Sequence, residues 1–180
     1  MSCCRLFRAV MFGAAALALV SGSAVAQKAK APEKPAAGPK LVSSAWTVGC
    51  RPAGKSQDLL CEASQTIALA ESRQTLLGVY VTPWKQAGKP DSFILRYQLP
   101  HGLNFPAGVQ VKIDDKAAPA PEIQTSNQVG VFARTDLTDP LLASLKKGAA
   151  MTVEFSSMNG NKLAIPVTLK GFSAVFEKLK

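Results

Sequence analysis

Four cysteines and a single histidine are the side chains of this 180-residue chain that are most suited to chemistry. Cys50 and Cys61 have ten residues between them, without the C-x-x-C spacing or the companion histidines of zinc sites. A disulfide between Cys50 and Cys61 is therefore favoured over a metal site. Cys3 and Cys4 lie close to the amino terminus, ahead of a long apolar run.

The histidine, His101, stands between Pro100 and Gly102, a sequence typical of a tight turn. A general base would need a partner at a recognisable spacing, and His101 has none, so a solvated turn residue is the preferred interpretation. The sequence also lacks G-x-S-x-G, H-E-x-x-H and glycine-rich phosphate-loop motifs. We therefore expect a protein that is not an enzyme and that has no catalytic residue and no cofactor.

Two pairs of neighbouring aspartates are better explained by local structure than by catalysis or metal binding. Asp114 and Asp115 are adjacent, so on a strand they would point to opposite faces, and a hairpin turn explains them better. Asp136 and Asp139 fit the approach to a short helix and its cap, because the alternating oxygen ligands of calcium loops are missing. No metal site is expected.

Two tryptophans are candidates for packing or binding. Trp46 shares strand parity with Cys50, so its indole is expected to pack against the disulfide in the core. Trp84 follows Thr82-Pro83 and precedes Lys85, which predicts a loop of basic character. Trp84 and Lys85 form a possible partner-binding site, because large aromatics often supply interface energy. The alternative is a loop that folds back on its own tryptophan.

The elements that position these residues are mostly strands. Apolar residues alternate with polar ones in eight runs, and Asn159-Gly160-Asn161 is a strong hairpin signal. Such closely spaced strands with turns predict an all-β fold, an antiparallel β-sandwich or barrel-like domain, with two short helices. The first helix begins with Asp139 as its N-cap, and the second lies at the C-terminus. The runs are 46–50, 61–69, 77–81, 93–99, 109–113, 129–133, 151–155 and 163–169.

The amino terminus predicts export. Residues 1–26 combine Arg5 and Arg8, an apolar run and a small-residue ending at Ala26, as in a cleaved signal peptide. The alternative, a membrane anchor, would need a longer apolar run. Cleavage would remove Cys3 and Cys4 and leave no transmembrane span.

A basic linker and a β domain follow. Residues 27–43 are rich in Pro, Ala and Lys and are expected to form a semi-extended tether, whereas 44–180 form the β domain. The tether is either a passive spacer or a basic arm for anionic lipid or polysaccharide. The whole chain carries +9, but export and the absence of an arginine–aromatic motif argue against nucleic acid as a partner.

Four segments resemble one protein family. They are AWTVGC, LLCEASQTI, LPHGLNFPAGVQVKID and LAIPVTLKGFSAVFEKL, and together they cover about residues 44–180. All four resemble the invasion-associated locus B family, which is found mainly in alphaproteobacteria. Its most specific features here are the tryptophan four residues before Cys50 and the closing LKGF of 169–172. The resemblance implies an all-β protein of the periplasm or outer surface without known catalytic activity, linked in some pathogens to host-cell entry.

One departure from the family pattern concerns cysteines. Family members often carry a second pair in a C-x-x-x-G-C arrangement, and this chain has Ser126 and Val131 at those positions. The role of that second disulfide is therefore not carried over to this chain.

The leading hypothesis is an exported envelope protein that binds an envelope or host-surface protein and contributes to attachment or invasion. A periplasmic chaperone or inhibitor of another exported protein, acting through a strand edge or the Trp84 loop, is the alternative. The sequence indicates no oligomeric state.

The disulfide gives a first prediction. Cys50→Ser should lower the Tm by several degrees, because a bridge that closes so short a loop stabilises the fold by roughly 2.5 to 3 kcal/mol. Thermal unfolding of the exported protein measures the change. An unchanged Tm, or two free thiols in the native protein, would contradict the prediction.

Overall fold

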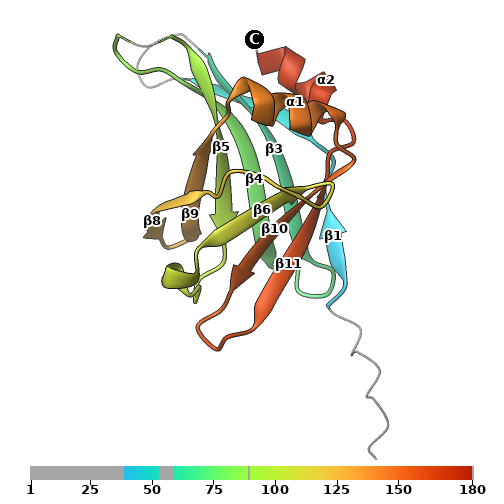
Figure 1. Ribbon diagram of the computed structural model, residues 1–180. Coiled ribbons are helices and arrows are strands. Elements are labelled where there is room, and N and C mark those ends of the chain that lie inside the picture. Colours follow the sequence, from blue (N-terminus) through green and yellow to red (C-terminus); the bar gives the residue numbers. More distant parts are fainter. Residues whose placement is uncertain (1–38, 53–58, 89, 180) are drawn as a thin grey trace, which may run out of the picture. The chain divides into compact units, whose positions relative to one another are not determined.

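The computed structural model describes residues 39–52, 59–88 and 90–179 (Figure 1). The predicted signal peptide and most of the predicted linker lie outside the described residues. The described chain forms two antiparallel sheets that face each other, with two short helices at one end (Figure 1). The predicted all-β sandwich is confirmed, and the sheets do not close into a barrel. The described part of the chain contains no helix of the length and hydrophobicity needed to cross a membrane.

The larger sheet has seven strands in the order β1-β3-β4-β5-β9-β8, with β2 also paired to β3. Its strands are β1 (Leu41–Ser43), β2 (Thr47–Pro52), β3 (Leu59–Leu69), β4 (Thr75–Trp84), β5 (Ser92–Leu99), β8 (Glu122–Asn127) and β9 (Gly130–Asp136). The smaller sheet has the order β11-β10-β6-β7. Its strands are β6 (Val109–Ile113), β7 (Lys116–Ala117), β10 (Ala150–Ser156) and β11 (Lys162–Thr168).

Four short helical segments complete the fold. They are η1 (Phe105–Ala107), α1 (Asp139–Lys147), α2 (Phe172–Phe176) and η2 (Glu177–Leu179). Both predicted helices are present, but the N-cap of α1 is Thr138 rather than Asp139, which is the first helical residue. This one-residue shift places Pro140 in the first turn, where its missing N–H needs no partner.

The core lies between the two sheets. Alternate residues of each strand point inward, so that Val79, Val81 and Tyr97 of the large sheet join Val111 and Val153 of the small one. Burial raises the pKa of the Tyr97 phenol above its usual range. Gln65, which interrupts the apolar pattern of β3, is also buried, and its amide donates to the Ser44 carbonyl at 2.8 Å.

Trp46 closes one side of the sandwich. It lies in the break between β1 and β2, where its ring is buried and meets Phe172 edge-on with centroids 5.1 Å apart. Its indole N–H donates to the Thr168 carbonyl at the end of β11, at 2.8 Å. Burial of Trp46 was expected, but the predicted packing against the disulfide is wrong, because Cys50 is exposed farther along β2.

The turns follow the local sequence. Asp114 and Asp115 form the two-residue β6–β7 turn and both have positive φ (46° and 64°), as a type I′ hairpin requires. Gly130 at the start of β9 has φ 153°, and a Cβ there would lie 2.5 Å from the Leu99 carbonyl oxygen of β5. Only glycine fits this approach of β9 to β5.

The two ends of the sandwich differ. The turn end comprises the β3–β4, β5–β6, β8–β9 and β10–β11 connections, and Lys40 leads into β1 there (Figure 1). The helix end carries α1, α2 and the β4–β5 connection (Figure 1). Leu41 pairs with Leu69, the last residue of β3, which fixes the entry of the chain at the turn end.

The closure by Trp46 gives a second prediction. Trp46→Phe should lower the free energy of unfolding by about 1 to 3 kcal/mol, because the part-buried hydrogen bond to the Thr168 carbonyl is lost while most apolar packing stays. Chemical denaturation measures the change. Trp84→Phe is the control and should lower the free energy of unfolding less, since Trp84 is only half-buried. Equal effects of the two changes would contradict the assigned role of Trp46.

Candidate binding face of the large sheet

Aromatic and arginine side chains gather on the outer face of the large sheet. Tyr80, Arg96 and Arg134 stand directly opposite one another on β4, β5 and β9. Trp84 and Phe132 lie on the same face, because they share strand parity with Tyr80 and Arg134. These five residues, Tyr80, Trp84, Arg96, Phe132 and Arg134, are here named the aromatic–arginine face.

Arg96 is held by its neighbours. Its Nη2 donates to Glu62 Oε2 at 2.8 Å, its Nε donates to Thr82 Oγ1 at 3.2 Å, and its Cζ lies 5.4 Å from the Tyr80 ring centroid. Burial and then the charge of Glu62 raise the pKa of the Tyr80 phenol, against the opposing effect of Arg96. Arg96 therefore serves mainly to order this part of the sheet.

Arg134 is held more loosely. Its guanidinium lies over the Trp84 ring at 5.0 Å, and its Nη2 lies 3.4 Å from Oδ1 of Asp136, whose side chain is 72% exposed. Among the described residues no other side-chain or backbone acceptor is within hydrogen-bond distance of Arg134. This ion pair contributes little to stability, because it is long and its carboxylate is largely exposed.

Two surface hollows adjoin the Trp84–Arg134 pair. One has a volume of about 390 Å³ and is lined by Ile94, Phe132 and polar side chains of β8, among them Gln124 and Asn127. The other, also about 390 Å³, lies toward the β4–β5 connection and includes Asp91 and Ser92. Trp84 and Arg134 line both hollows. The aromatic ring of Trp84, the cation of Arg134 and the side-chain amides of β8 therefore line the same hollow.

The register of the two arginines is unfavourable for stability. Arg96 and Arg134 are directly opposed on β5 and β9, and like charges in that position destabilise a sheet. The sheet offsets this repulsion with Glu62 on one side and with Asp136 on the other. The two arginine side chains are exposed to a similar extent, 33% for Arg96 and 28% for Arg134.

The predicted partner-binding residues behave differently from each other. Trp84 is the last residue of β4 and is half-buried, so its predicted position in a loop is wrong. Lys85 is exposed beyond the strand, with its Nζ 3.4 Å from Asp91 Oδ2 in a solvent-exposed pair. The sequence interpretation missed Arg134 and Phe132. Both lie at outward-facing positions of β9, which alternate with the inward-facing apolar residues Val131 and Ala133.

The other candidate residues are accounted for locally. Cys50 and Cys61 form the predicted disulfide between directly paired positions of β2 and β3, with Cα atoms 4.0 Å apart. His101 is exposed, and its Nε2 lies 3.4 Å from the Gln128 carbonyl oxygen. Within the described ranges, no group of three or more His, Cys, Asp or Glu side chains is arranged to hold a metal ion.

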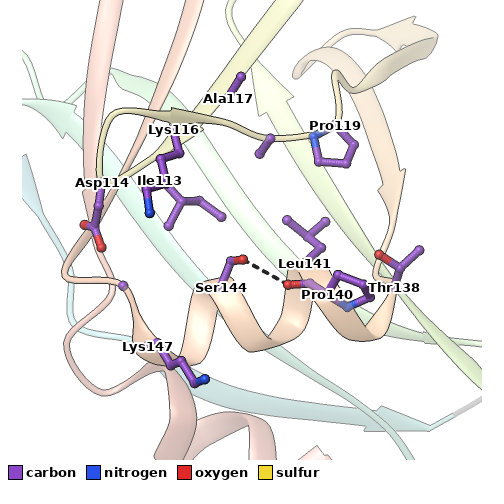
Figure 2. A pocket seen from close by; sticks show the side chains of 12 residues that line it. Ile113, Asp114, Lys116, Ala117, Pro119, Thr138, Pro140, Leu141, Ser144 and Lys147 are labelled. Atoms are coloured by element: carbon purple, nitrogen blue, oxygen red, sulfur yellow. Dashed lines mark hydrogen bonds between the residues drawn. The ribbon is translucent and has the colours of Figure 1, made fainter.

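A further hollow, of about 380 Å³, lies between α1 and the β6–β7 turn (Figure 2). Ile113 and Leu141 line its interior, and Ser144 donates to the Pro140 carbonyl at 2.9 Å (Figure 2). Asp114 accepts from the backbone N–H groups of Ala149 and Ala150, each at 3.0 Å. Since these polar groups are already used by the fold, this hollow is a weaker candidate than the aromatic–arginine face.

Comparison with known proteins identifies the family. The family model described as invasion associated locus B protein matches residues 46–180. The chain belongs to the invasion associated locus B family. An invasion protein B homolog of Brucella abortus (strain 2308) is 27% identical over 136 residues, which are 75% of this chain and 75% of that protein. A homolog from Brucella abortus biovar 1 (strain 9-941) gives the same values.

A solved structure supports the fold. The crystal structure of invasion associated protein b from Bartonella henselae superposes with a TM-score of 0.61 at 16% sequence identity. The match covers 77% of this chain and 94% of that chain. At this level of identity the likeness concerns the fold alone.

The invasion associated locus B pattern suggests an engineered disulfide. Ser126 and Val131, where many members are expected to have a second cysteine pair, are directly paired across the β8–β9 hairpin. The double change Ser126→Cys/Val131→Cys should therefore form a second disulfide under oxidising conditions and stabilise the protein by about 2 kcal/mol.

Thiol counting by mass spectrometry and thermal unfolding test this expectation. Ser126→Cys alone is the control and should keep its thiol free without raising the Tm. Two free thiols in the oxidised double variant would contradict the pairing of β8 with β9.

Proposed function

We propose that this member of the invasion associated locus B family is an exported binding protein of the bacterial envelope that acts without catalysis. The observation that carries the proposal is the directly opposed pair Arg96 and Arg134, of which Arg134 lies over the Trp84 ring and has a 3.4 Å ion pair with the largely exposed Asp136. A predicted signal peptide and a disulfide support export to an oxidising compartment, the periplasm or the outer surface.

The lining of the face indicates the chemistry of the partner. Arg134 suits a carboxylate or another planar anion, and Trp84 and Phe132 suit an apolar or aromatic group next to it. Gln124 and Asn127 supply amide groups for the polar rim. An acidic segment of an envelope or host-surface protein combines these groups. Because the family is described as invasion associated, the proposal includes a contribution to host-cell attachment or invasion.

A second candidate function uses the edge of the large sheet. β8 is the last strand of the sheet order, so one of its edges has no partner strand within the described chain. A periplasmic chaperone or inhibitor could hold an extended segment of another exported protein there. The register shift after Ile123 lies in the β8–β9 ladder and makes β8 itself irregular, and we therefore rank this function second.

Arg134→Gln tests the leading proposal. The change should reduce recovery of the partner about tenfold or more, because it removes the cation. It should leave the Tm unchanged or raise it, because it relieves the repulsion from Arg96. Cross-linking on intact cells followed by a pull-down gives the recovery, and thermal unfolding gives the Tm.

Lys112→Gln is the matched control, since Lys112 forms a 2.7 Å ion pair with Glu154 on the outer face of the small sheet. It should leave recovery unchanged. Equal recovery by the wild type and Arg134→Gln would refute the proposal. Protection of the protein from added protease on whole cells would favour the periplasmic alternative. An activity that His101→Ala abolishes would instead support an enzyme.

A further inference from the structure

Three large apolar side chains are exposed at the turn end of the sandwich. Five large apolar residues are exposed in the described chain, and three of them lie in turns at this end. Phe105 is 49% exposed, Val129 65% and Met158 73%. Single exposed apolar residues are ordinary, but three of them in turns at one end make that end a candidate interaction site. Phe105, Val129 and Met158 are here named the turn-end patch.

Hydrogen bonds hold the three turns of this patch together. The Met158 N–H donates to the Gly102 carbonyl at 2.8 Å, and the Asn104 N–H donates to the Ser156 carbonyl at 2.9 Å. Gln98 Nε2 donates to the Val129 carbonyl at 3.0 Å. The β5–β6 and β10–β11 connections are therefore bonded to each other, and the β8–β9 connection is bonded to the end of β5 at the same end of the sandwich (Figure 1). The apolar side chains project from ordered backbone, so little conformational entropy is lost when they are buried.

The charges at this end are mostly positive. No acidic residue occurs in the three turns 99–109, 126–131 and 156–163, whereas Lys162 begins β11 there. In the described β3–β4 turn Glu71 is accompanied by Arg73. Lys40, whose carbonyl accepts from the Ala70 N–H at 2.9 Å, also lies at this end. In the sequence it is preceded by Lys28, Lys30 and Lys34, with Glu33 as the single acid of 27–40.

From this combination we infer that the turn-end patch rests on the head-group layer of an anionic phospholipid bilayer. Apolar side chains on rigid turns can enter the boundary between head groups and acyl chains, while nearby cations are attracted to lipid phosphates. The inference goes beyond the proposed function and uses none of the aromatic–arginine face, which lies on the outer side of the large sheet.

The test uses the exported protein, with its first residue verified, and sucrose-loaded vesicles of phosphatidylglycerol and phosphatidylcholine. Wild type should sediment with these vesicles and not with pure phosphatidylcholine. The triple change Phe105→Ser/Val129→Ser/Met158→Ser should reduce the apparent partition coefficient about tenfold or more, since it removes the inserting groups. These residues are exposed, so the fold should persist, and thermal unfolding verifies this.

Matched variants separate what the turn-end patch, the aromatic–arginine face and the basic linker each contribute to vesicle binding. Leu59→Ser, at a residue 65% exposed at the opposite end of β3, should leave vesicle binding unchanged, and so should Arg134→Gln. Replacement of the lysines at 28, 30, 34 and 40 by glutamine should weaken binding without abolishing it. The inference is overturned if wild type does not bind vesicles, binds neutral vesicles equally, or binds as well after the triple change. Capture of a protein by this end in the absence of vesicle binding would also overturn it.

Discussion

The sandwich depends on the contact that Trp46 makes across its open side. The hydrogen bond from its indole to Thr168 and the edge-on contact with Phe172 join the first strands of the domain to its last ones. Because β11 and β3 belong to different sheets and share no backbone ladder, side-chain contacts such as this one hold the two sheets together here. The indole turns inward at the break between β1 and β2, where the Gln65 amide donates to the Ser44 carbonyl and Ser44 Oγ accepts from the Thr66 N–H of β3.

Ion pairs and a cation–π contact order the outer face of the large sheet. Glu62 binds Arg96 at 2.8 Å and also lies 3.4 Å from Arg51, so it connects β2, β3 and β5 through charge. This network uses one of the two opposed arginines for order and leaves the other, Arg134, on the ring of Trp84. The proposed binding function depends on that division between Arg96 and Arg134.

Much of the fold could be predicted from sequence because strand parity and turn chemistry are local. The eight alternating runs became strands, and Asp114-Asp115 and Asn159-Gly160-Asn161 became hairpin turns. β8 was missed because its residues are mostly polar and exposed, so they show no alternation. Trp84 was assigned to a loop because of Pro83, which β4 tolerates because its ladder with β3 ends at Ala63 and Val81.

The candidate site was only partly predictable for a similar reason. Trp84 could be singled out as a large aromatic, but its partner Arg134 is fifty residues away in the sequence and comes beside it only through the pairing of β5 with β9. Likewise, parity predicted that Trp46 is buried but could not identify Phe172 as its neighbour. Contacts between distant strands require the register, which a single sequence does not contain.

The distance along the chain between Trp46 and Thr168 also governs the order of folding. The hydrogen bond between them spans 122 residues, so the sandwich cannot close until nearly the whole domain is available. The neighbouring strands β3, β4 and β5 pair through short connections and can form earlier, since closing a short loop loses less entropy. During that interval the inner face of the early hairpins is open to solvent and prone to aggregation. The contact of the indole with β11 and α2 therefore needs both ends of the domain, and a chain that lacks its carboxyl-terminal residues cannot form it.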